Sequence, residues 1–537
     1  MFKIIRQIWP MIISAITGFL LALFLFFPKI YPSNQNVYRI IREKISVLNQ
    51  IIGYVNHFYF DSVDMDKIMD GAFNGLMEEL DPHSTYIPAK EQENINELFK
   101  GKFQGIGIEF DILEGFITVI SPVPDSPSDI VGLMPGDKII AINGQDAYKI
   151  TKPEVFDKLR GKKGTKVTVR ISRLGESKPF DVTIIRDNIP IYSIGAATML
   201  DNETGYIFLR RFSATTEKEF ISAVDTLLSQ GMKRLLFDLR GNSGGFLEQA
   251  AAISDQLITS IDTLVYTKGK IKESNQVFRS SPKKGNGTFS LIIMINRGSA
   301  SAAEIVSGAV QDLDRGLVVG ETSFGKGLVQ RQLPLDTGSA IRVTIARYYT
   351  PSGRLIQRPY EDGNDLAYYR ELYSSNREEK IDSLKELRPK YMTKSGRTVY
   401  GGGGITPDIY IPYKNNINTH TIKVLRNPKR PFFNFASHNS LDIQKKFKSF
   451  KSFKENWKMS DIVFENFIQH LSSDSIEVIK DSLTIDIDYI ENQIKSELAG
   501  SIWGKNEGAN IRLLFDNQII EALKHFNEAD AFIESIN

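Results

Sequence analysis

The sequence predicts a multidomain α+β protein with a membrane anchor, a helical segment, an all-β module, an α/β core and a C-terminal helical domain. Three observations predict it. An uncharged apolar stretch opens the chain, short alternating strands with tight turns fill residues 101–187, and buried-strand runs alternate with amphipathic helices over residues 188–412. With 537 residues, of which 42% are hydrophobic, the chain is long enough to build three or four domains.

The anchor is predicted over residues 1–30. Residues 7–28 carry no charge, and a helix of that length, at ~1.5 Å per residue, crosses a ~30 Å hydrocarbon core. Lys3 and Arg6 precede the stretch, which keeps the amino end inside. A cleaved signal peptide is the alternative, but no small-x-small site follows the apolar run. We therefore expect an uncleaved single-pass anchor in the cytoplasmic membrane, with the rest of the chain on the periplasmic side.

Two regions are expected to be helical. Residues 31–100 carry apolar residues at i, i+3, i+4 spacing, and they could pack on the body of the protein or help form a dimer. Residues 413–537 are expected to form a helical extension that helps control access or assembly. Within it, residues 441–458 predict one amphipathic helix with a lysine-rich face. That helix either packs on its neighbours or presents a membrane-surface or partner-binding face.

A serine at a strand-to-helix junction is the strongest chemical signal in the α/β core. Ser301 follows a buried-strand run at residues 291–296 and precedes apolar residues at helical spacing from Ala302 onward. Free N–H groups and the dipole at a helix N-terminus favour negative charge, so an oxyanion forming at Ser301 could take an N–H from Ala302. The alternative is that Ser301 only caps the helix, which is a common use of serine.

Lys326, 25 positions later, is the candidate general base. A lysine at its ordinary pKa of ~10.4 is no base at neutral pH, but burial can lower that pKa by several units. Lys326 stands between Gly325 and Gly327 and between two strand-like runs, which favours burial over a solvated loop. The segment also fits a phosphate-loop pattern from Gly320, but Gly327 stands where that loop needs Ser or Thr, and a strand-like run follows. Residues 340–357 are expected to continue the same sheet.

The composition narrows the chemistry further. The chain has no cysteine, which excludes a thiolate nucleophile and disulfides, and none of its six histidines lies between His83 and His420. A Ser-His pair would therefore need a distant partner. A net charge of +2 gives no reason to expect a nucleic-acid partner. Residues 234–258 predict a buried strand, a glycine-rich turn and an amphipathic helix. The turn is a natural second oxyanion donor, although a plain strand-to-helix turn also favours glycine.

Four segments together resemble the signatures of the C-terminal processing peptidases, also called tail-specific proteases. They are DLRGNSGG (238–245), GSASAAEI (298–305), GETSFGKGLVQ (320–330) and GGGGITPDIYIP (401–412). The resemblance covers roughly residues 60–412, and it implies a PDZ domain at 101–187 and an α/β Ser-Lys peptidase core at 188–412. The site residues that it implies are the nucleophile Ser301, the general base Lys326, its positioning residue Gln330, and the oxyanion amides of Ala302 and of Gly245 or Gly244.

The resemblance implies neither a metal nor a cofactor, and it leaves His83, in GLMEELDPHSTYIP, a structural rather than a catalytic role. In a PDZ domain an extended peptide joins the sheet edge and loop N–H groups capture its terminal carboxylate. Gly105, Ile106 and Gly107 would form that loop, and Ile106 and Ile108 would line an apolar pocket. The alternative is a plain β module that only spaces domains.

The expected function is that of a serine endopeptidase that binds the C-termini of unfolded or loosely folded extracytoplasmic proteins and cleaves them. The expected partners are those tails and, through the anchor, the inner membrane, with a homo-oligomer or an adaptor protein left open. A competing hypothesis is a catalytically silent PDZ scaffold or chaperone. The intact set of Ser301, Lys326 and Gln330 favours the enzyme.

Overall fold

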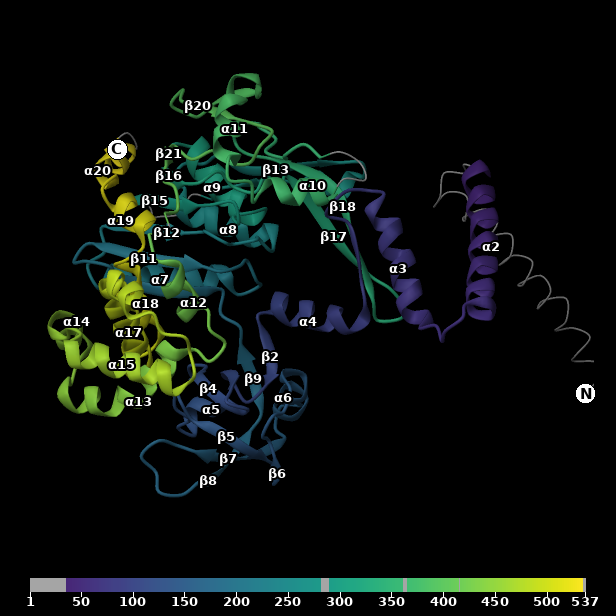
Figure 1. The fold of residues 1–537 in the computed structure, drawn as a ribbon. Helices are drawn as coiled ribbons and strands as arrows, with labels where there is room; N and C mark the ends of the chain where they lie inside the picture. The colour runs from purple at the N-terminus through teal and green to yellow at the C-terminus, as the bar shows by residue number, and fades with distance from the viewer. Residues whose placement is uncertain (1–34, 282–288, 361–364, 415, 535–537) are drawn as a thin grey trace, which may run out of the picture. The chain divides into compact units, whose positions relative to one another are not determined.

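Figure 1 shows the fold of the computed structural model, which describes residues 35–281, 289–360, 365–414 and 416–534. The chain divides into two units, residues 1–73 and 74–537. The first unit contains α2 (Gln35–Phe58), and α3 (Met65–Glu78) begins in the first unit and ends in the second. The predicted anchor at residues 1–30 lies outside the described residues. Among the helices that the structure does describe, none has the length and apolarity needed to span a membrane.

The all-β module is built on one antiparallel sheet in the order β3-β4-β5-β7-β8, with β6 paired to β5. Alternate residues of β7 point into the core of the module, as the period of a half-buried strand requires. Its elements are β3 (Ile108–Leu113), β4 (Phe116–Pro122), α5 (Pro127–Ile130), β5 (Lys138–Ile142), β6 (Gln145–Asp146), α6 (Lys152–Leu159), β7 (Lys166–Ser172) and β8 (Phe180–Ile185). The chain enters along β2 (Lys102–Gly105) and leaves along β9 (Asp187–Pro190), and these two strands pair antiparallel.

The α/β core contains a six-stranded sheet in the order β10-β11-β12-β15-β16-β21. The edge strand β10 is antiparallel to β11, and every other neighbouring pair is parallel. These strands are β10 (Ile194–Met199), β11 (Thr204–Leu209), β12 (Arg234–Asp238), β15 (Ser290–Ile295), β16 (Leu317–Gly320) and β21 (Ile409–Tyr410). Because parallel strands end at a common edge, the segments that follow β12, β15 and β16 meet there, and these segments carry the predicted site.

Helices cover both faces of this sheet. One face packs against α7 (Thr216–Ser229), α8 (Leu247–Leu257) and α9 (Ala302–Asp312). The other face packs against the last three described helices of the chain, which Figure 1 draws in yellow beside the sheet. These are α18 (Lys505–Leu513), α19 (Asn517–Leu523) and α20 (Phe526–Glu534). The end of the C-terminal extension is therefore part of the α/β core.

A second, antiparallel sheet lies beside the core in the order β1-β18-β13-β14, with β17 also paired to β18. The expectation that residues 340–357 continue the first sheet is therefore wrong, because β18 pairs with β1, β13 and β17. Its strands are β1 (Thr85–Ile87), β13 (Thr263–Gly269), β14 (Val277–Arg279), β17 (Leu328–Pro334) and β18 (Ala340–Tyr349). The remaining described elements between residues 74 and 412 are α4 (Ala89–Lys100), η1 (Lys272–Ser274), α10 (Asp365–Glu371), α11 (Arg377–Ser383), η2 (Lys385–Leu387) and the hairpin of β19 (Lys390–Met392) and β20 (Thr398–Tyr400).

The first part of the C-terminal extension has an aromatic-rich helical core of its own. Its helices are α12 (Thr419–Leu425), α13 (Pro431–Lys446), α14 (Phe450–Asn456), α15 (Asp461–Ser473), α16 (Lys480–Ile485) and α17 (Ile487–Ile502). The single helix expected over residues 441–458 is in fact two, because Phe447 turns into an extended conformation and Ser449 caps the start of α14. Phe447, Phe453 and Trp457 are buried in the helical core, so the apolar stripe packs internally.

Candidate active site

Ser301 lies between the end of β15 and the first residue of α9, at the carboxyl edge of the sheet. Its backbone has φ 54° and ψ −110°, a combination that side-chain-bearing residues rarely adopt, so the position is strained. The conformation is held from both sides, because the Ser301 N–H donates to Glu304 Oε2 at 2.8 Å and its carbonyl accepts from Tyr348 Oη at 3.2 Å. The next amide, that of Ala302, is the first of α9 and has no acceptor within the helix.

Glu304 is a fully buried carboxylate that connects the serine and lysine segments. Besides the Ser301 amide, its oxygens accept from the amides of Gly325 (2.7 Å) and Lys326 (2.9 Å) and from the Ser323 hydroxyl. Burial raises the pKa of the Glu304 carboxyl, and these hydrogen bonds act in the opposite direction. One side chain therefore fixes the backbone of Ser301 relative to that of Lys326.

Lys326 lies in the loop between β16 and β17, with its amine largely buried. Its Nζ donates to Gln330 Oε1 at 2.7 Å rather than to Ser301 Oγ. The pKa of the Lys326 amine is lowered from 10.5 to about 8, chiefly by burial and then by the nearby Arg342 guanidinium, while Asp81 opposes the shift. The strand β17 follows this loop directly, so the helix that a phosphate loop requires is absent at this position.

Gln330 is held by the segment that precedes β1. Its Nε2 donates to the backbone carbonyl of His83, which leaves Oε1 facing Lys326. The turn at His83 is in turn fixed by Asp81, whose carboxylate accepts from the amides of His83 and Ser84, each at 2.9 Å. The pKa of the His83 imidazole is lowered to about 4, first by burial and then by Lys326, so the ring is neutral at physiological pH. His83 thus contributes its carbonyl to the site.

The glycine turn after β12 lies directly against Ser301. A Cβ at Gly244 would stand 2.9 Å from Ser301 Cβ and 3.0 Å from the Ala302 nitrogen, so only glycine fits there. The Gly244 amide donates to Asn242 Oδ1 at 2.9 Å. Of the two glycines predicted to supply an oxyanion donor, Gly244 is therefore already engaged, and Gly245 is the better candidate.

The predicted tail-binding loop lies in the all-β module, and the structure does not bring it together with Ser301. Ile106 and Gly107 lie between β2 and β3, in neither strand, and Ile106 is buried in the core of the module. Ile108 begins β3, which is an edge strand of the sheet. The rings of Phe110 on β3 and Phe156 on α6 are 5.5 Å apart between centroids. A side chain of the edge strand β3 thus packs against α6.

Comparison with known proteins assigns the core and the module. Residues 203–362 match peptidase family S41, and residues 97–172 match the PDZ domain. The carboxy-terminal-processing protease of Bartonella bacilliformis is 36% identical over 331 residues, covering 60% of this chain and 74% of that protein. The chain belongs to the C-terminal processing peptidase family. As a member of this family it is a serine-type peptidase, and its all-β module is a PDZ domain.

A second relative agrees with this peptidase assignment. The carboxy-terminal processing protease CtpA of Bacillus subtilis is 35% identical over 317 residues, covering 59% of this chain and 67% of that protein. Among solved structures, the photosystem II D1 C-terminal processing protease covers 67% of this chain and 85% of its own, at 22% identity and a TM-score of 0.34. Residues 430–504 match a family of unknown function, DUF8443.

Three residues of the peptidase site were not singled out from the sequence: Glu304, Asn242 and Asp81. For Glu304 a signal exists, since Ser301 and Glu304 have the S-x-x-E spacing of a capping box, in which the glutamate accepts from the first backbone amide. Asn242 and Asp81 each accept from backbone amides two or three positions later, Gly244 for Asn242 and His83 and Ser84 for Asp81. Such turns are local patterns, but the sequence does not show that they lie against Ser301 and Gln330.

Proposed function

We propose that this peptidase uses a Ser-Lys dyad, with Ser301 as nucleophile and Lys326 as general base. The observation that carries the proposal is the buried Lys326 amine. Because its pKa is about 8, a fraction of the molecules carries a neutral amine near physiological pH, and this neutral amine can accept a proton. Its amine is held by a hydrogen bond to Gln330 (2.7 Å), and Glu304 accepts from the backbone amides of both Lys326 and Ser301. Because hydrogen bonds in an unliganded site often tighten only when substrate binds, the amine is expected to reach Ser301 Oγ in the Michaelis complex.

The chemistry follows from these groups. Ser301 Oγ attacks the peptide carbonyl while Lys326 takes its proton, and the amides of Ala302 and Gly245 stabilise the oxyanion. The tetrahedral intermediate collapses as Lys326 returns the proton to the leaving amine, which leaves an acyl-enzyme. Water then attacks the ester while Lys326 accepts its proton, and Lys326 passes that proton to the departing Ser301 Oγ, which releases the new carboxyl group and restores the free serine.

We further propose that the PDZ domain selects substrates by their C-termini. A tail would add to the edge of β3 with its carboxylate at residues 105–107, of which Gly105 ends β2 and Ile106 and Gly107 connect it to β3. The substrates would be loosely folded extracytoplasmic proteins, reached by a chain that is anchored in the cytoplasmic membrane through residues 1–30. Uncharged residues 7–28 support this location. We expect the full chain to stay in membranes that have been washed with carbonate. We also expect added protease to digest the PDZ domain only from the periplasmic side.

The deciding experiment uses the full chain in detergent with an unfolded reporter protein that ends in apolar residues. We expect cleavage by the parent protein and none by Ser301→Ala or Lys326→Ala. Ser307→Ala is the matched control, because its hydroxyl is on the same helix and only donates to the Ala303 carbonyl (2.9 Å). Cleavage by Ser301→Ala would refute the dyad. Capture of the reporter without cleavage by the parent protein would favour the scaffold hypothesis.

The role of the tail is tested with the same reporter carrying a C-terminal amide in place of the free carboxylate. Loss of the carboxylate is expected to raise KM with little change in kcat, because it removes binding made equally in the ground and transition states. Equal kcat/KM for the two reporters would contradict recognition of the C-terminus.

A further inference from the structure

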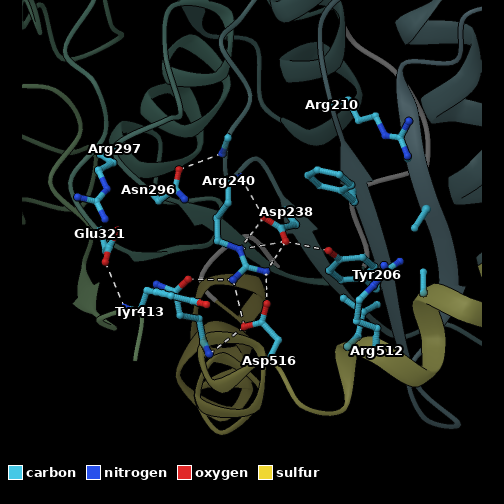
Figure 2. Close-up of a pocket in the computed structure, with 17 residues that line it drawn as sticks. Tyr206, Arg210, Asp238, Arg240, Asn296, Arg297, Glu321, Tyr413, Arg512 and Asp516 are labelled. Atoms are coloured by element: carbon cyan, nitrogen blue, oxygen red, sulfur yellow. Dashed lines mark hydrogen bonds and ion pairs between the residues drawn. The ribbon is translucent and has the colours of Figure 1, made fainter. Parts of the chain in front are cut away.

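Two side chains of the C-terminal extension contact the segment that carries the glycine turn proposed to bind the oxyanion. Figure 2 shows Asp516, the residue before α19, pointing at the guanidinium of Arg240, which follows β12. Arg240 Nη2 is 2.9 Å from Asp516 Oδ2, and Nη1 donates to Asp516 Oδ1 at 3.1 Å. Nη1 also donates to Gln518 Oε1 at 2.9 Å. Asp516 and Gln518 both lie outside residues 203–362, the range that matches the peptidase family.

Arg240 is held on its other side by the strand that it follows. Its Nε and Nη2 donate to the two oxygens of Asp238 at 3.0 and 2.7 Å, and Tyr206 Oη donates to the same carboxylate at 2.8 Å. Burial alone would lower the pKa of the Arg240 guanidinium, but Asp238 and then Asp516 reverse this and raise it above its usual range. Arg240 is therefore fixed between one carboxylate of the sheet and one of the extension.

Hydrogen bonds continue from Arg240 to the serine segment. The Gly241 amide donates to Asn296 Oδ1 at 2.9 Å, and the Ala300 amide donates to the Asn242 carbonyl at 2.9 Å. Asn242 Oδ1 also holds the Gly244 amide. A shift of the Arg240 backbone would therefore displace both Gly245 and Ala300, the residue before Ser301.

We propose that Asp516 is a positioning residue, which through its ion pair with Arg240 holds the glycine turn at residues 241–245 in the geometry that receives the oxyanion. The α18–α19 segment of the C-terminal extension then completes the active site without touching substrate. This role rests on the proposed Ser-Lys mechanism. It differs from a stabilising role because it predicts a change in kcat with little change in KM.

A cavity beside the ion pair makes the proposal sharply testable. It has a volume of about 650 Å³, and both Arg240 and Asp516 line it. Truncation in Asp516→Ala would leave Arg240 facing this cavity without its second carboxylate. A small carboxylate such as formate has room to enter and to take the place of the missing side chain.

The experiment measures kcat and KM of the full chain on the unfolded reporter. For Asp516→Ala we expect kcat to fall roughly 10- to 100-fold with KM within about twofold, since small misplacements and lost oxyanion contacts have effects of that order. Sodium formate is expected to restore at least part of kcat, whereas sodium chloride at equal ionic strength does not. Asp516 also caps α19, because Oδ1 accepts from the amides of Gln518 and Ile519 at 3.0 and 3.1 Å. If the alanine variant does not fold, Asp516→Asn keeps a good cap, and kcat is expected to fall in that variant too.

Asp530→Ala is the matched control. Asp530 on α20 pairs with Arg234 at 3.4 Å, so it joins the same extension to the start of the same strand β12, far from the glycine turn. Its kcat is expected to stay within about twofold of the parent's. A wild-type kcat in Asp516→Ala, or equal losses in both variants without formate rescue, would overturn the proposal. Ser301→Ala runs beside them, because cleavage there would refute the proposed nucleophile whatever Asp516 does.

Discussion

In the proposed mechanism, the pKa of Lys326 sets the pH at which this peptidase works. Only the neutral amine can accept the Ser301 proton, and its lowered pKa of about 8 means that most molecules carry a protonated lysine below that pH. We therefore expect kcat/KM to rise with pH, with an inflection near pH 8 and about a tenfold loss per pH unit well below it. A pH–rate profile on a short peptide measures this. An inflection near pH 10.5 would mean that the lysine is not buried, and one near pH 4 would point to His83.

Glu304 is expected to matter for stability and catalysis together. Glu304→Gln places an amide group where amides from Ser301, Gly325 and Lys326 converge, so at least one buried donor loses its acceptor. We expect the free energy of unfolding to fall by about 2–4 kcal/mol and kcat to fall at least about 100-fold. Urea denaturation and steady-state kinetics measure the two effects. Glu321→Gln is the control, because its carboxylate accepts only from the Tyr413 amide among the described contacts.

The sequence singles out the two residues proposed to perform the chemistry and the positioning residue Gln330, but not the groups that hold Gln330 and the backbone of the dyad. Ser301 and Lys326 stand in local patterns, a strand-to-helix junction and a glycine-flanked strand loop, whose physics favours a nucleophile and a buried base. The carbonyl of His83 orients Gln330 from 247 positions away in the sequence. Every residue has a backbone carbonyl, so the residue type does not show which carbonyl makes this contact. Only the folded structure identifies it.

At the scale of elements, the loop between β2 and β3 carries the predicted tail specificity. Gly107 has φ +84°, and a Cβ there would lie 2.3 Å from Ser126 Cβ, so Gly107→Ala must displace the loop. We expect the affinity for a peptide with an apolar C-terminus to fall at least about tenfold, while a short peptide without such a tail is cleaved at the parent rate. Fluorescence anisotropy of a labelled tail peptide measures the affinity.

Gly144→Ala is the control for this variant. It has a similar positive φ of +78° in the turn between β5 and β6, but a Cβ there meets no atom within 4 Å. We therefore expect Gly144→Ala to lower the free energy of unfolding by about 1–2 kcal/mol through backbone strain, without changing the affinity for the tail peptide. If the two glycine variants bind the tail equally well, the loop does not hold the carboxylate.

The type of most elements followed from sequence periodicity, but their pairing did not. The runs that became β16 and β17 were expected as strands, yet β17 and β18 form a separate antiparallel sheet, because pairing depends on contacts that alternation does not encode. The expected helix at residues 441–458 broke at Phe447, whose burial in a local core outweighs helical continuity. Tertiary packing thus overrode local propensity at both places.

At the scale of the whole molecule, the C-terminal extension and the peptidase sheet share one hydrophobic core. Leu236, Ile292 and Met294 of the sheet pack in the same cluster as Ile519 and Phe526 of the last helices. Residues outside the range that matches the peptidase family therefore cover one face of its sheet, which is also where Asp516 reaches Arg240. We infer that the peptidase core and these helices fold as one cooperative unit.

Phe526→Ala tests this shared core. Phe526 is 1% exposed, so its truncation leaves a cavity under the sheet and is expected to lower the free energy of unfolding by about 3–5 kcal/mol. Because the change lies at the core rather than at the glycine turn, kcat per folded molecule is expected to stay near the parent value. Ile520→Ala, on the exposed side of α19 at 44% exposure, should change stability by less than about 0.5 kcal/mol. Calorimetry of thermal unfolding measures whether the helices and the peptidase core unfold together. A separate early transition in Phe526→Ala, at an unchanged temperature of the peptidase transition, would show that the helices form an independent domain.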